Sequence, residues 1–280
     1  MRNCLIIVNT FKTEASPLGT EVKLFLQARG IQCTVFSYDG SAVEPPTGYF
    51  DFVVTLGGDG TVLFAARFYA PKHIPIFSVN LGNFGFIAGV EKDCWKQELT
   101  DYIEGKMAVQ KRSLLTAAVE RNGRQMFTAL ALNDIVVSAK MAVHLVNIDV
   151  CYNDAPLGKF KSDGIIVSTS TGSTAYSAAC GGPIVAPSVD ALILTPMNSF
   201  SLSSRPLVLG GDGVLTMTVL PSRAGLAVTA DGQIPFELKE DDKIKINLAK
   251  DIKAELVCSN EGHFFAALRS KLNWSGGPHA

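Results

Sequence analysis

The hydrophobic positions of the first hundred residues fall into short continuous runs. Residues 5–8, 34–36, 52–56 and 76–79 predict four strands, and the run at 52–56 is apolar on both faces. Strands that are buried on both faces are typical of mostly parallel sheets that helices cover from two sides. The chain is therefore expected to begin with an α/β domain that has a Rossmann-like, mostly parallel sheet.

Helical periodicity appears between these runs. Leu18, Val22 and Leu26 recur at the spacing of one helix face, and residues 62–69 can form a second helix. A third helix is predicted to start at Asp93, because aspartate is a favoured N-cap residue. Alternating strands and helices of this kind support the α/β assignment.

The pattern changes after residue 107, where helical spacing nearly vanishes and turn signals recur about every ten residues. Asn122-Gly123, Asn153-Asp154 and Asp231-Gly232 each lie between apolar runs. Such pairs favour two-residue hairpin turns, because both central residues tolerate positive φ. The second part of the chain is therefore predicted to be rich in antiparallel strands.

These patterns divide the chain into an α/β domain over residues 1–107 and a β-rich domain over residues 108–263. Residues 264–280 return to helical or irregular spacing, and we expect them to pack back on the first domain. Residues 275–280 form a small polar tail that is expected to fray. With 280 residues, 47% of them apolar, the chain can bury the cores of two domains.

Composition narrows the choice of partners. The chain has 25 Lys and Arg against 26 Asp and Glu, a net charge of −1, and no block of like charges, so neither nucleic acid nor a membrane surface is an expected partner. No apolar stretch reaches the ~20 residues of a membrane span, and no signal peptide is visible, so we expect a cytoplasmic protein. The six scattered cysteines are expected to be buried free thiols.

The first candidate site follows the predicted strand at 52–56. Glycines at the carboxyl end of a parallel strand let a ligand approach the backbone, and the start of the next helix attracts phosphate. The letters alone are equally compatible with a local turn or helix cap at the aspartate. Residues 210–213 repeat Gly-Gly-Asp-Gly where a β-turn is the simplest interpretation. The segment comprises Gly57, Gly58, Asp59, Gly60 and Thr61.

Two more segments are polar or glycine-rich near predicted strands. The loop at residues 80–86 follows the next strand, and its Phe84 and Phe86 could cover a flat ring. Asn133 and Asp134 interrupt an apolar run, where their side chains need partners such as ligand hydroxyls. An Asn-Asp turn between strands is the alternative for this pair.

The densest polar pattern surrounds the predicted strand at 165–168. Asp163 precedes this strand, and a hydroxyl-rich loop centred on glycine follows it. The short hydroxyl side chains of this loop can donate and accept hydrogen bonds, and its tyrosine offers a face for stacking. A Ser/Thr-rich surface loop is the alternative interpretation, since such loops are common. The loop residues of interest are Thr171, Gly172, Ser173, Thr174, Ala175 and Tyr176.

Together these segments resemble the NAD kinase family over most of the chain. The resemblance lies in Gly-Gly-Asp-Gly-Thr at 57–61, Asn-Asp at 133–134 where the family has Asn-Glu, and Thr-Gly-Ser-Thr-Ala-Tyr at 171–176. Asp163 and the later blocks at residues 200–209 and 231–233 also match, and the loop at 80–86 matches with some divergence. The resemblance implies an N-terminal α/β domain and a β-rich C-terminal domain, as the residue patterns do.

The resemblance implies transfer of a phosphoryl group from ATP or polyphosphate to the adenosine 2′-hydroxyl of NAD, giving NADP. Mg²⁺ or another divalent cation is expected on the donor phosphates. Asp59 would accept the hydroxyl proton, and Gly57, Gly58, Gly60 and Thr61 would admit the donor phosphates. A homo-oligomer, a dimer or a tetramer, is expected from the family.

The resemblance also implies which residues bind NAD. Asn133 and Asp134 would hold the adenosine, Tyr176 would stack on its base, and Asp163 would face the nicotinamide end. The ring of Phe86 would either cover the ligand or fill the core. Asp134 is shorter than the family's usual Glu by about 1.5 Å, which weakens the expectation for its contacts. Thr174 with Ala175 would contact the adenosine near the base, and Thr171, Gly172 and Ser173 would belong to the same NAD-binding loop.

Three other functions are compatible with parts of the pattern. A lipid or sugar kinase could share the Gly-Gly-Asp-Gly loop, but the polar segments at 133–134 and 171–176 fit a nucleotide acceptor better. A non-catalytic NAD sensor would keep the NAD site and lack the base at Asp59. A purely structural α/β protein would have no need for glycines concentrated at strand ends.

Overall fold

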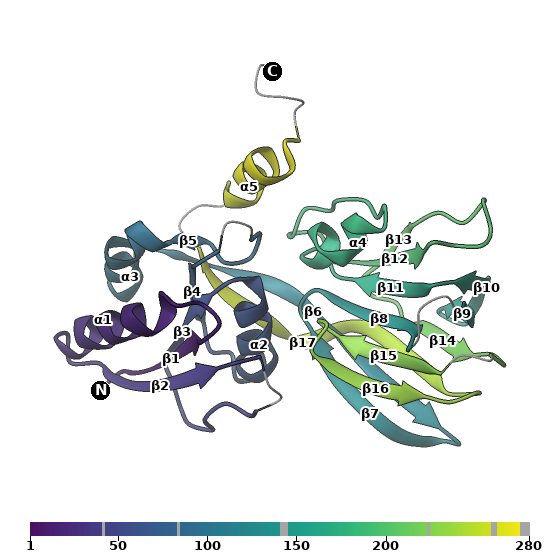
Figure 1. The fold of residues 1–280 in the computed structure, drawn as a ribbon, viewed down its shortest axis with the longest axis horizontal. Helices are drawn as coiled ribbons and strands as arrows, with labels where there is room; N and C mark the ends of the chain where they lie inside the picture. The colour runs from purple at the N-terminus through teal and green to yellow at the C-terminus, as the bar shows by residue number, and fades with distance from the viewer. Residues whose placement is uncertain (41–42, 83–84, 141–144, 223–224, 259–261, 275–280) are drawn as a thin grey trace. The chain divides into compact units, whose positions relative to one another are not determined.

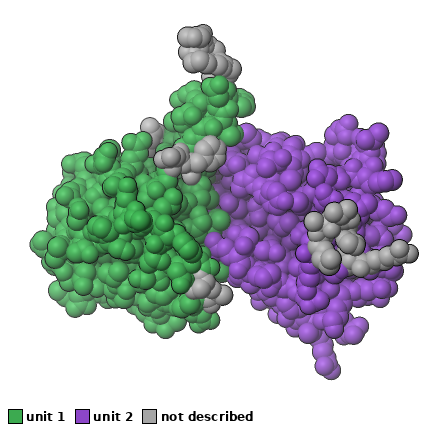
Figure 2. Space-filling view, viewed as in Figure 1, with its two compact units in different colours: residues 1–112, 253–280 green, residues 113–252 purple. Residues whose placement is uncertain are grey.

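The chain forms two compact units, coloured separately in Figure 2: unit 1 comprises residues 1–112 and 253–280, and unit 2 comprises residues 113–252. The boundaries fall inside two long strands, β6 (Ala108–Arg121) and β17 (Lys243–Cys258), whereas the sequence-based boundaries follow residues 107 and 263, outside these strands. A continuous strand gives no break in the hydrophobic pattern. The computed structural model describes residues 1–40, 43–82, 85–140, 145–222, 225–258 and 262–274.

Unit 1 is built on a parallel sheet (Figure 1). A short strand, β5 (Val90–Glu91), and the end of β17 pair with its last strand. Each of the four main strands contains one of the predicted apolar runs, which confirms the α/β, mostly parallel assignment. Their order is β2 (Gln32–Tyr38), β1 (Asn3–Asn9), β3 (Phe52–Gly57) and β4 (Ile76–Asn80).

Helices cover both faces of this sheet. α1 (Ala15–Gln27) and α3 (Trp95–Ile103) share one apolar cluster with the strands. α2 (Asp59–Tyr69) packs on β1, β3 and β4 without joining that cluster, and so covers the other face (Figure 1). There Phe64 stacks on Tyr38 with ring centroids 4.2 Å apart.

The ends of two helices have features that the sequence did not predict. A 3₁₀ turn, η2 (Lys92–Cys94), precedes α3, and Cys94 is the N-cap residue. The N-cap prediction for Asp93 is therefore wrong, because the helical backbone already begins before that residue. A second 3₁₀ turn, η1 (Ala70–Lys72), follows α2.

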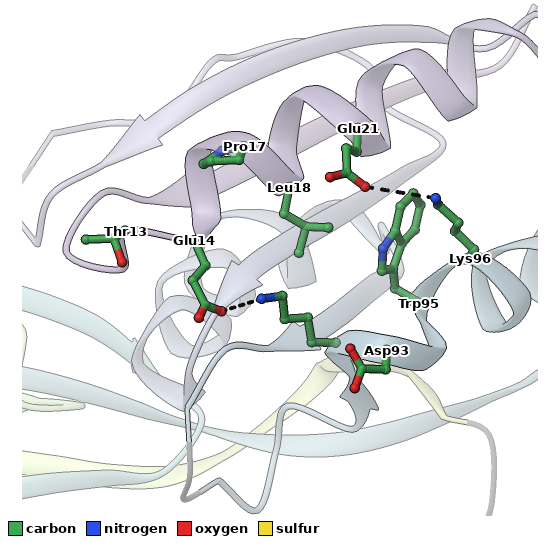
Figure 3. A pocket seen from close by; sticks show the side chains of 9 residues that line it. Thr13, Glu14, Pro17, Leu18, Glu21, Asp93, Trp95 and Lys96 are labelled. Atoms are coloured by element: carbon green, nitrogen blue, oxygen red, sulfur yellow. Dashed lines mark hydrogen bonds and ion pairs between the residues drawn. The ribbon is translucent and has the colours of Figure 1, made fainter.

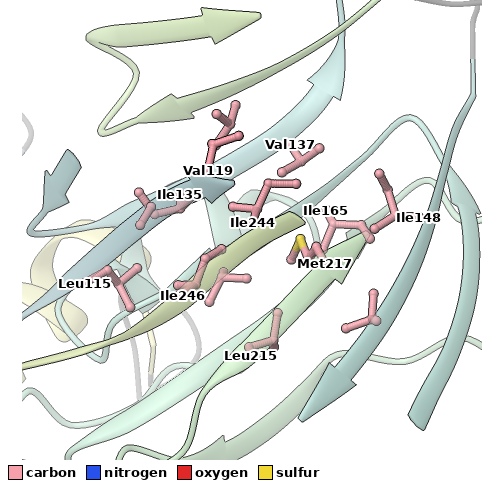
Figure 4. Close-up of a cluster of buried hydrophobic side chains, with 14 of the residues drawn as sticks. Leu115, Val119, Ile135, Val137, Ile148, Ile165, Leu215, Met217, Ile244 and Ile246 are labelled. Carbon is pink, nitrogen blue, oxygen red and sulfur yellow. The ribbon is translucent and has the colours of Figure 1, made fainter. Parts of the chain in front are cut away.

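Unit 2 is a sandwich of two sheets. Side chains from both sheets form one apolar cluster, in which Ile135 and Ile165 of one sheet join Ile148 and Met217 of the other (Figure 4). This confirms the β-rich prediction. The first sheet has the order β13 (Leu207–Gly210), β12 (Ala191–Met197), β11 (Gly164–Ser168), β8 (Asp134–Ala139), β15 (Leu226–Ala230) and β16 (Ile234–Leu238). The second contains β10 (Ala155–Ser162), β9 (Val146–Tyr152), β14 (Leu215–Val219), β17, β6 and β7 (Arg124–Ala131).

The predicted hairpin turns are confirmed by their backbone angles. Asn122 and Gly123 have φ of 51° and 73°, and the pairs Asn153-Asp154 and Asp231-Gly232 also have positive φ at both residues. The Gly-Gly-Asp-Gly repeat at 210–213 is a turn, as expected, and it connects β13 of one sheet to β14 of the other. Gly213 is required there, since a Cβ would lie 2.3 Å from the Tyr152 ring.

The described cysteines are free thiols, but they are not all buried. Cys4 and Cys258 are buried, three others are half-buried, and Cys94 is exposed. The prediction of burial is therefore wrong for Cys94, which lies in the 3₁₀ turn before α3 rather than in an apolar run. Among the described residues, no helix is long and apolar enough to cross a membrane.

Substitution of Gly123 by valine should destabilise the β6–β7 hairpin, because a β-branched residue is strained at a φ of 73°. We expect the free energy of unfolding to fall by about 1–3 kcal/mol in urea titrations of the full chain. Gln125→Val, at an exposed extended position of β7, is the matched control and should change little. Equal losses in both variants would contradict this assignment of the turn.

Candidate functional site

The Asp59 carboxylate holds a backbone loop from another part of unit 1. The N–H of Phe86 donates to Oδ2 at 2.7 Å, and the N–H groups of Ile87 and Ala88 donate to Oδ1 at 3.2 and 3.0 Å. Asp59 is the first residue of α2, whose N-cap residue is Gly58, and these three bonds connect its side chain to a loop 27 to 29 positions later. The alternative that Asp59 forms a local turn or cap is therefore wrong.

The glycines around Asp59 serve two different purposes. A Cβ on Gly85 would lie 2.7 Å from Asp59 Oδ1, and one on Gly57 would lie 2.2 Å from Thr61 Oγ1, so both positions are filled by neighbouring side chains. At Gly58 and Gly60, by contrast, a Cβ would meet no atom of the described residues within 4 Å. The start of α2 therefore has open space beside its backbone, as a phosphate-binding loop requires.

The loop after β4 lies next to the loop after β3. The N–H of Leu81 donates to the carbonyl oxygen of Gly57 at 2.7 Å, and Thr61 Oγ1 accepts a hydrogen bond from Asn9 Nδ2 at 3.0 Å. The carboxyl ends of β1, β3 and β4 thus meet at one edge, where α/β folds bind ligands. The ring of Phe86 is buried, 8% exposed, and Phe84 lies outside the described residues.

The C-terminal segment, which we expected to pack back on the first domain, forms the helix α5 (His263–Leu272), and this helix contacts the loop after β4. Lys271 Nζ donates to the carbonyl oxygen of Gly85, and the His263 ring lies beside Gly89. Burial, with the nearby charges of Lys271 and Arg112, lowers the pKa of His263. The helix spacing of this segment is ambiguous, so no pattern could assign its contacts.

In unit 2, the turn at Asn133 is held by the carboxylate of Asp231. Leu132 N–H donates to Oδ2 at 2.9 Å, and the N–H groups of Asn133 and Asp134 donate to Oδ1 at 2.8 and 3.1 Å. Asp231 N–H donates back to the carbonyl oxygen of Asp134 at 2.9 Å. Asn133 lies in a bend between β7 and β8, as the turn alternative supposed, but its side chain and that of Asp134 are buried.

The hydroxyl-rich loop docks on this turn. Thr169 N–H donates to the carbonyl oxygen of Asn133 at 2.9 Å, and Thr169 Oγ1 donates to the carbonyl oxygen of Leu132 at 2.6 Å. A Cβ on Gly172 would lie 2.1 Å from the Asn133 carbonyl oxygen, so glycine is required at this position. The structure therefore brings together Asn133, Asp134 and the 171–176 segment.

The residues of this loop do not all face outward. Ser173 Oγ donates to the carbonyl oxygen of Ser170 at 2.7 Å and accepts the Val185 N–H at 3.0 Å, so its hydroxyl bonds lie inside the loop. Thr171, Gly172 and Ser173 are buried. Thr171 is the N-cap residue of the 3₁₀ turn η3 (Gly172–Thr174), and the other two lie inside that turn. Thr174 and Ala175 are half-buried, and Tyr176, the first residue of α4 (Tyr176–Ala179), is 45% exposed.

Tyr176 lies within electrostatic range of two of the predicted acids. Burial raises its pKa, and the negative charges of Asp134 and Asp163 raise it further. Asp163 is exposed and precedes β11, so it lies at the opposite end of that strand from Thr169. Asn198 Nδ2 donates to Asp163 Oδ2 at 2.9 Å and fixes that carboxylate.

A separate surface pocket of unit 1 contains none of the predicted site residues. It has a volume of about 530 Å³ and lies between α1 and the start of α3 (Figure 3). Two ion pairs cross it, Glu14–Lys92 at 2.7 Å and Glu21–Lys96 at 3.9 Å, on exposed side chains. Exposed ion pairs of this kind contribute little to stability. The pocket has no carboxylate, among the described residues, that accepts three backbone N–H groups as Asp59 and Asp231 do.

Comparison with known proteins decides the family. Residues 41–107 match the ATP-NAD kinase N-terminal domain, and residues 132–257 match the ATP-NAD kinase C-terminal domain. The chain is 46% identical over 278 residues to NAD kinase of Treponema denticola, covering 99% of this chain and 98% of that protein. It is 32% identical over 282 residues to NAD kinase of Geobacter sulfurreducens, covering 98% and 99%. This chain belongs to the NAD kinase family.

Solved structures of NAD kinase relatives share the fold. Yeast NADH kinase, complexed with NADH, has a TM-score of 0.84 at 22% identity, covering 99% of this chain and 89% of that one. An NAD kinase from Archaeoglobus fulgidus, in complex with ATP, has a TM-score of 0.76 at 24% identity, covering 96% and 99%. Membership of the NAD kinase family does not favour the lipid kinase, sugar kinase or sensor alternatives.

Substitution of Asp231 by asparagine should loosen the turn at residues 132–134, because an amide offers one acceptor oxygen where the carboxylate offers two. We expect local opening to become easier by about 1–3 kcal/mol, seen as faster hydrogen exchange of the three amides by NMR. Asp154→Asn, in an exposed turn with positive φ, is the control. Unchanged exchange in Asp231→Asn would show that the carboxylate does not hold the turn.

Proposed function

We infer that this chain transfers a phosphoryl group to the adenosine 2′-hydroxyl of NAD, giving NADP. Its membership of the NAD kinase family supports this reaction, since both domains of the family match and a relative named NAD kinase is 46% identical over almost the whole chain. The geometry of the Asp59 carboxylate is the observation that carries the mechanism.

Asp59 has one acceptor position left for a substrate hydroxyl. A carboxylate offers about four lone-pair directions, two on each oxygen. Among the residues that the structure describes, Oδ1 accepts two N–H groups, from Ile87 and Ala88, while Oδ2 accepts only that of Phe86. We propose that Oδ2 receives the proton of the 2′-hydroxyl as the bond to phosphorus forms.

The donor phosphates are proposed to lie at the start of α2. Gly58 and Gly60 leave open space there, and Gly57 with Thr61 fixes the turn from the other side. We propose ATP, or polyphosphate, as the donor, because the positive end of a helix dipole attracts phosphate whatever group it is attached to. That an NAD kinase of Archaeoglobus fulgidus was solved with ATP supports the first of these donors.

The described residues do not supply a set of ligands for the expected divalent cation, Mg²⁺. The part of the chain that the structure describes has no group of three or more His, Cys, Asp or Glu side chains placed to hold a metal ion. Three of the four acceptor directions of Asp59 are already used. We therefore propose that the oxygens of the donor phosphates coordinate the cation.

NAD is proposed to bind in unit 2, where Asn133, Asp134 and the loop at 171–176 meet. The exposed ring of Tyr176 is placed to stack on the adenine, and Thr174 and Ala175 lie beside it on the half-buried side of the loop. Asp163, at the far end of β11, would contact the nicotinamide end of the dinucleotide. We propose a cytoplasmic location for this reaction.

Asp59→Asn should lower the rate of NADP formation by about 10²–10⁴-fold, because an amide cannot accept the hydroxyl proton. The assay uses NAD with ATP or polyphosphate and Mg²⁺, alongside measurements of NAD affinity and thermal stability. Asp212→Asn, in the Gly-Gly-Asp-Gly turn between β13 and β14, is the matched control and should retain full activity. A fully active Asp59→Asn enzyme would remove the base from this mechanism.

Homo-oligomerisation is proposed from apolar side chains that unit 2 exposes. Phe200 and Leu202 are 76% and 92% exposed in the loop before β13, and β13 is an edge strand with exposed Leu207 and Val208. Light scattering should give two or four times the chain mass of 29.9 kDa. Phe200→Ser with Leu202→Ser should lower this mass, and Val35→Ser in unit 1 should not. A wild-type mass of one chain would refute the proposal.

A further inference from the structure

Among the described residues, two buried polar side chains beside the hydroxyl-rich loop lack hydrogen-bond partners, and both lie next to Asp134. Asp134 begins β8 and Ser168 ends β11, and the two are directly opposite in the antiparallel register, so their side chains lie on the same face of the sheet. Ser168 is 0% exposed and Asp134 5% exposed. Among the described residues, neither Ser168 Oγ nor Asn133 Oδ1 has a partner.

Buried polar groups are normally hydrogen-bonded, because an unpaired one loses its hydration without compensation. Two of them on either side of the buried Asp134 carboxyl indicate a place where a polar ligand completes the bonding. Ser168 is not among the residues that the sequence analysis selected. It lies at the end of a fully buried strand, where serine is easily taken for a small core residue.

The surroundings of Asp134 oppose a negative charge on it. Asp231, from the turn after β15, faces it with a carboxylate whose charge is already stabilised by three N–H groups. Tyr176 of α4 and Cys180, which follows α4, are the other titratable groups in range, and neither is a cation. Burial, and then the charge of Asp231, raises the pKa of Asp134 to about 7.

The protons of Tyr176 and Cys180 do not compete in this range. Burial raises the pKa values of both groups above their ordinary values of 10.0 and 9.0, so both stay neutral near pH 7. Among the groups that face this position, Asp134 is thus the one whose charge changes between pH 6 and 8. The two phosphates of NAD would add negative charge to the site and oppose ionisation further.

Resting on the proposed function, we propose that Asp134 binds the adenosine of NAD as a neutral carboxylic acid, with Ser168 as a second hydroxyl contact to the same nucleoside. A neutral acid has one O–H donor and one free carbonyl acceptor, and the serine hydroxyl has one donor and two acceptor positions. Together with Asn133 Oδ1 they complement a nucleoside, which presents hydroxyls, ring nitrogens and an amino group. An ionised Asp134 would lose its donor.

Calorimetric titration of NAD into the full chain, without a phosphate donor, tests this directly. The protonated fraction of a group with a pKa of about 7 falls about tenfold between pH 6 and pH 8, so NAD affinity should fall about tenfold. At pH 8, binding should also take up close to one proton, measured by comparing buffers of different ionisation enthalpy.

Three variants separate this role from a structural one. Asp134→Asn, a neutral isostere, should bind NAD at every pH about as well as the wild type does at pH 6, with no proton uptake. Ser168→Ala should bind several-fold more weakly at every pH and keep the pH dependence. Asp241→Asn, an exposed acid in unit 2, should behave as the wild type.

The outcomes distinguish this inference from the proposed function. If the wild type forms NADP and its NAD affinity is constant or rises between pH 6 and 8, the inference is overturned and the function stands. Loss of NAD binding in a folded Asp134→Asn variant also overturns it, because the charged form would then be the one that binds. If NAD does not bind at any pH, the proposed function fails and the inference with it.

Discussion

A carboxylate that accepts three backbone N–H groups is the interaction on which the candidate loops of each unit depend. Asp59 does this to residues 86–88 in unit 1, and Asp231 does it to residues 132–134 in unit 2. Backbone N–H groups in a turn have no strand or helix partner and must find an acceptor. Bonds to a charged acceptor are shorter and stronger than bonds between neutral groups, so one acid fixes the shape of each loop.

The carboxylates of Asp59 and Asp231 differ in whether they can still bind a substrate group. Asp59 is half-buried, and no second donor to Oδ2 lies in the described part of the chain, so we propose that Oδ2 meets a substrate hydroxyl. Asp231 is buried, and its charge acts on the neighbouring Asp134, whose proton it helps to retain. Similar local geometry is thus proposed to serve a proton acceptor in one unit and a proton-retaining environment in the other.

Local features of the fold could be predicted from the sequence, and long-range ones could not. The strands of unit 1 and the turn at Asn122-Gly123 depend on residues a few positions apart, and the structure confirms them. The resemblance to the NAD kinase family, which the comparisons confirm, supplied the candidate site residues. Asp231 looked like one more turn residue, because its three partners lie 97 to 99 positions earlier.

The direction of side chains, like the long-range contacts, could not be predicted from the sequence. Ser173 and Thr174 are adjacent hydroxyl residues in one loop, yet the first is fully buried and bonded within the loop and the second is half-buried. Composition gives the number of donors in such a loop, whereas the packing against Val185 and Asn133 decides which way they face. The same limit applies to Ser168, whose environment depends on its register with β8.

The central claim is that the acid which holds residues 86–88 also receives the 2′-hydroxyl proton. A crystal structure of the chain with NAD and a non-hydrolysable ATP analogue tests it most directly. We predict the adenosine 2′-oxygen within about 2.6–3.2 Å of Asp59 Oδ2, with all three N–H bonds to that carboxylate intact. A 2′-hydroxyl bound to another side chain, with Asp59 out of reach of the sugar, would contradict the account.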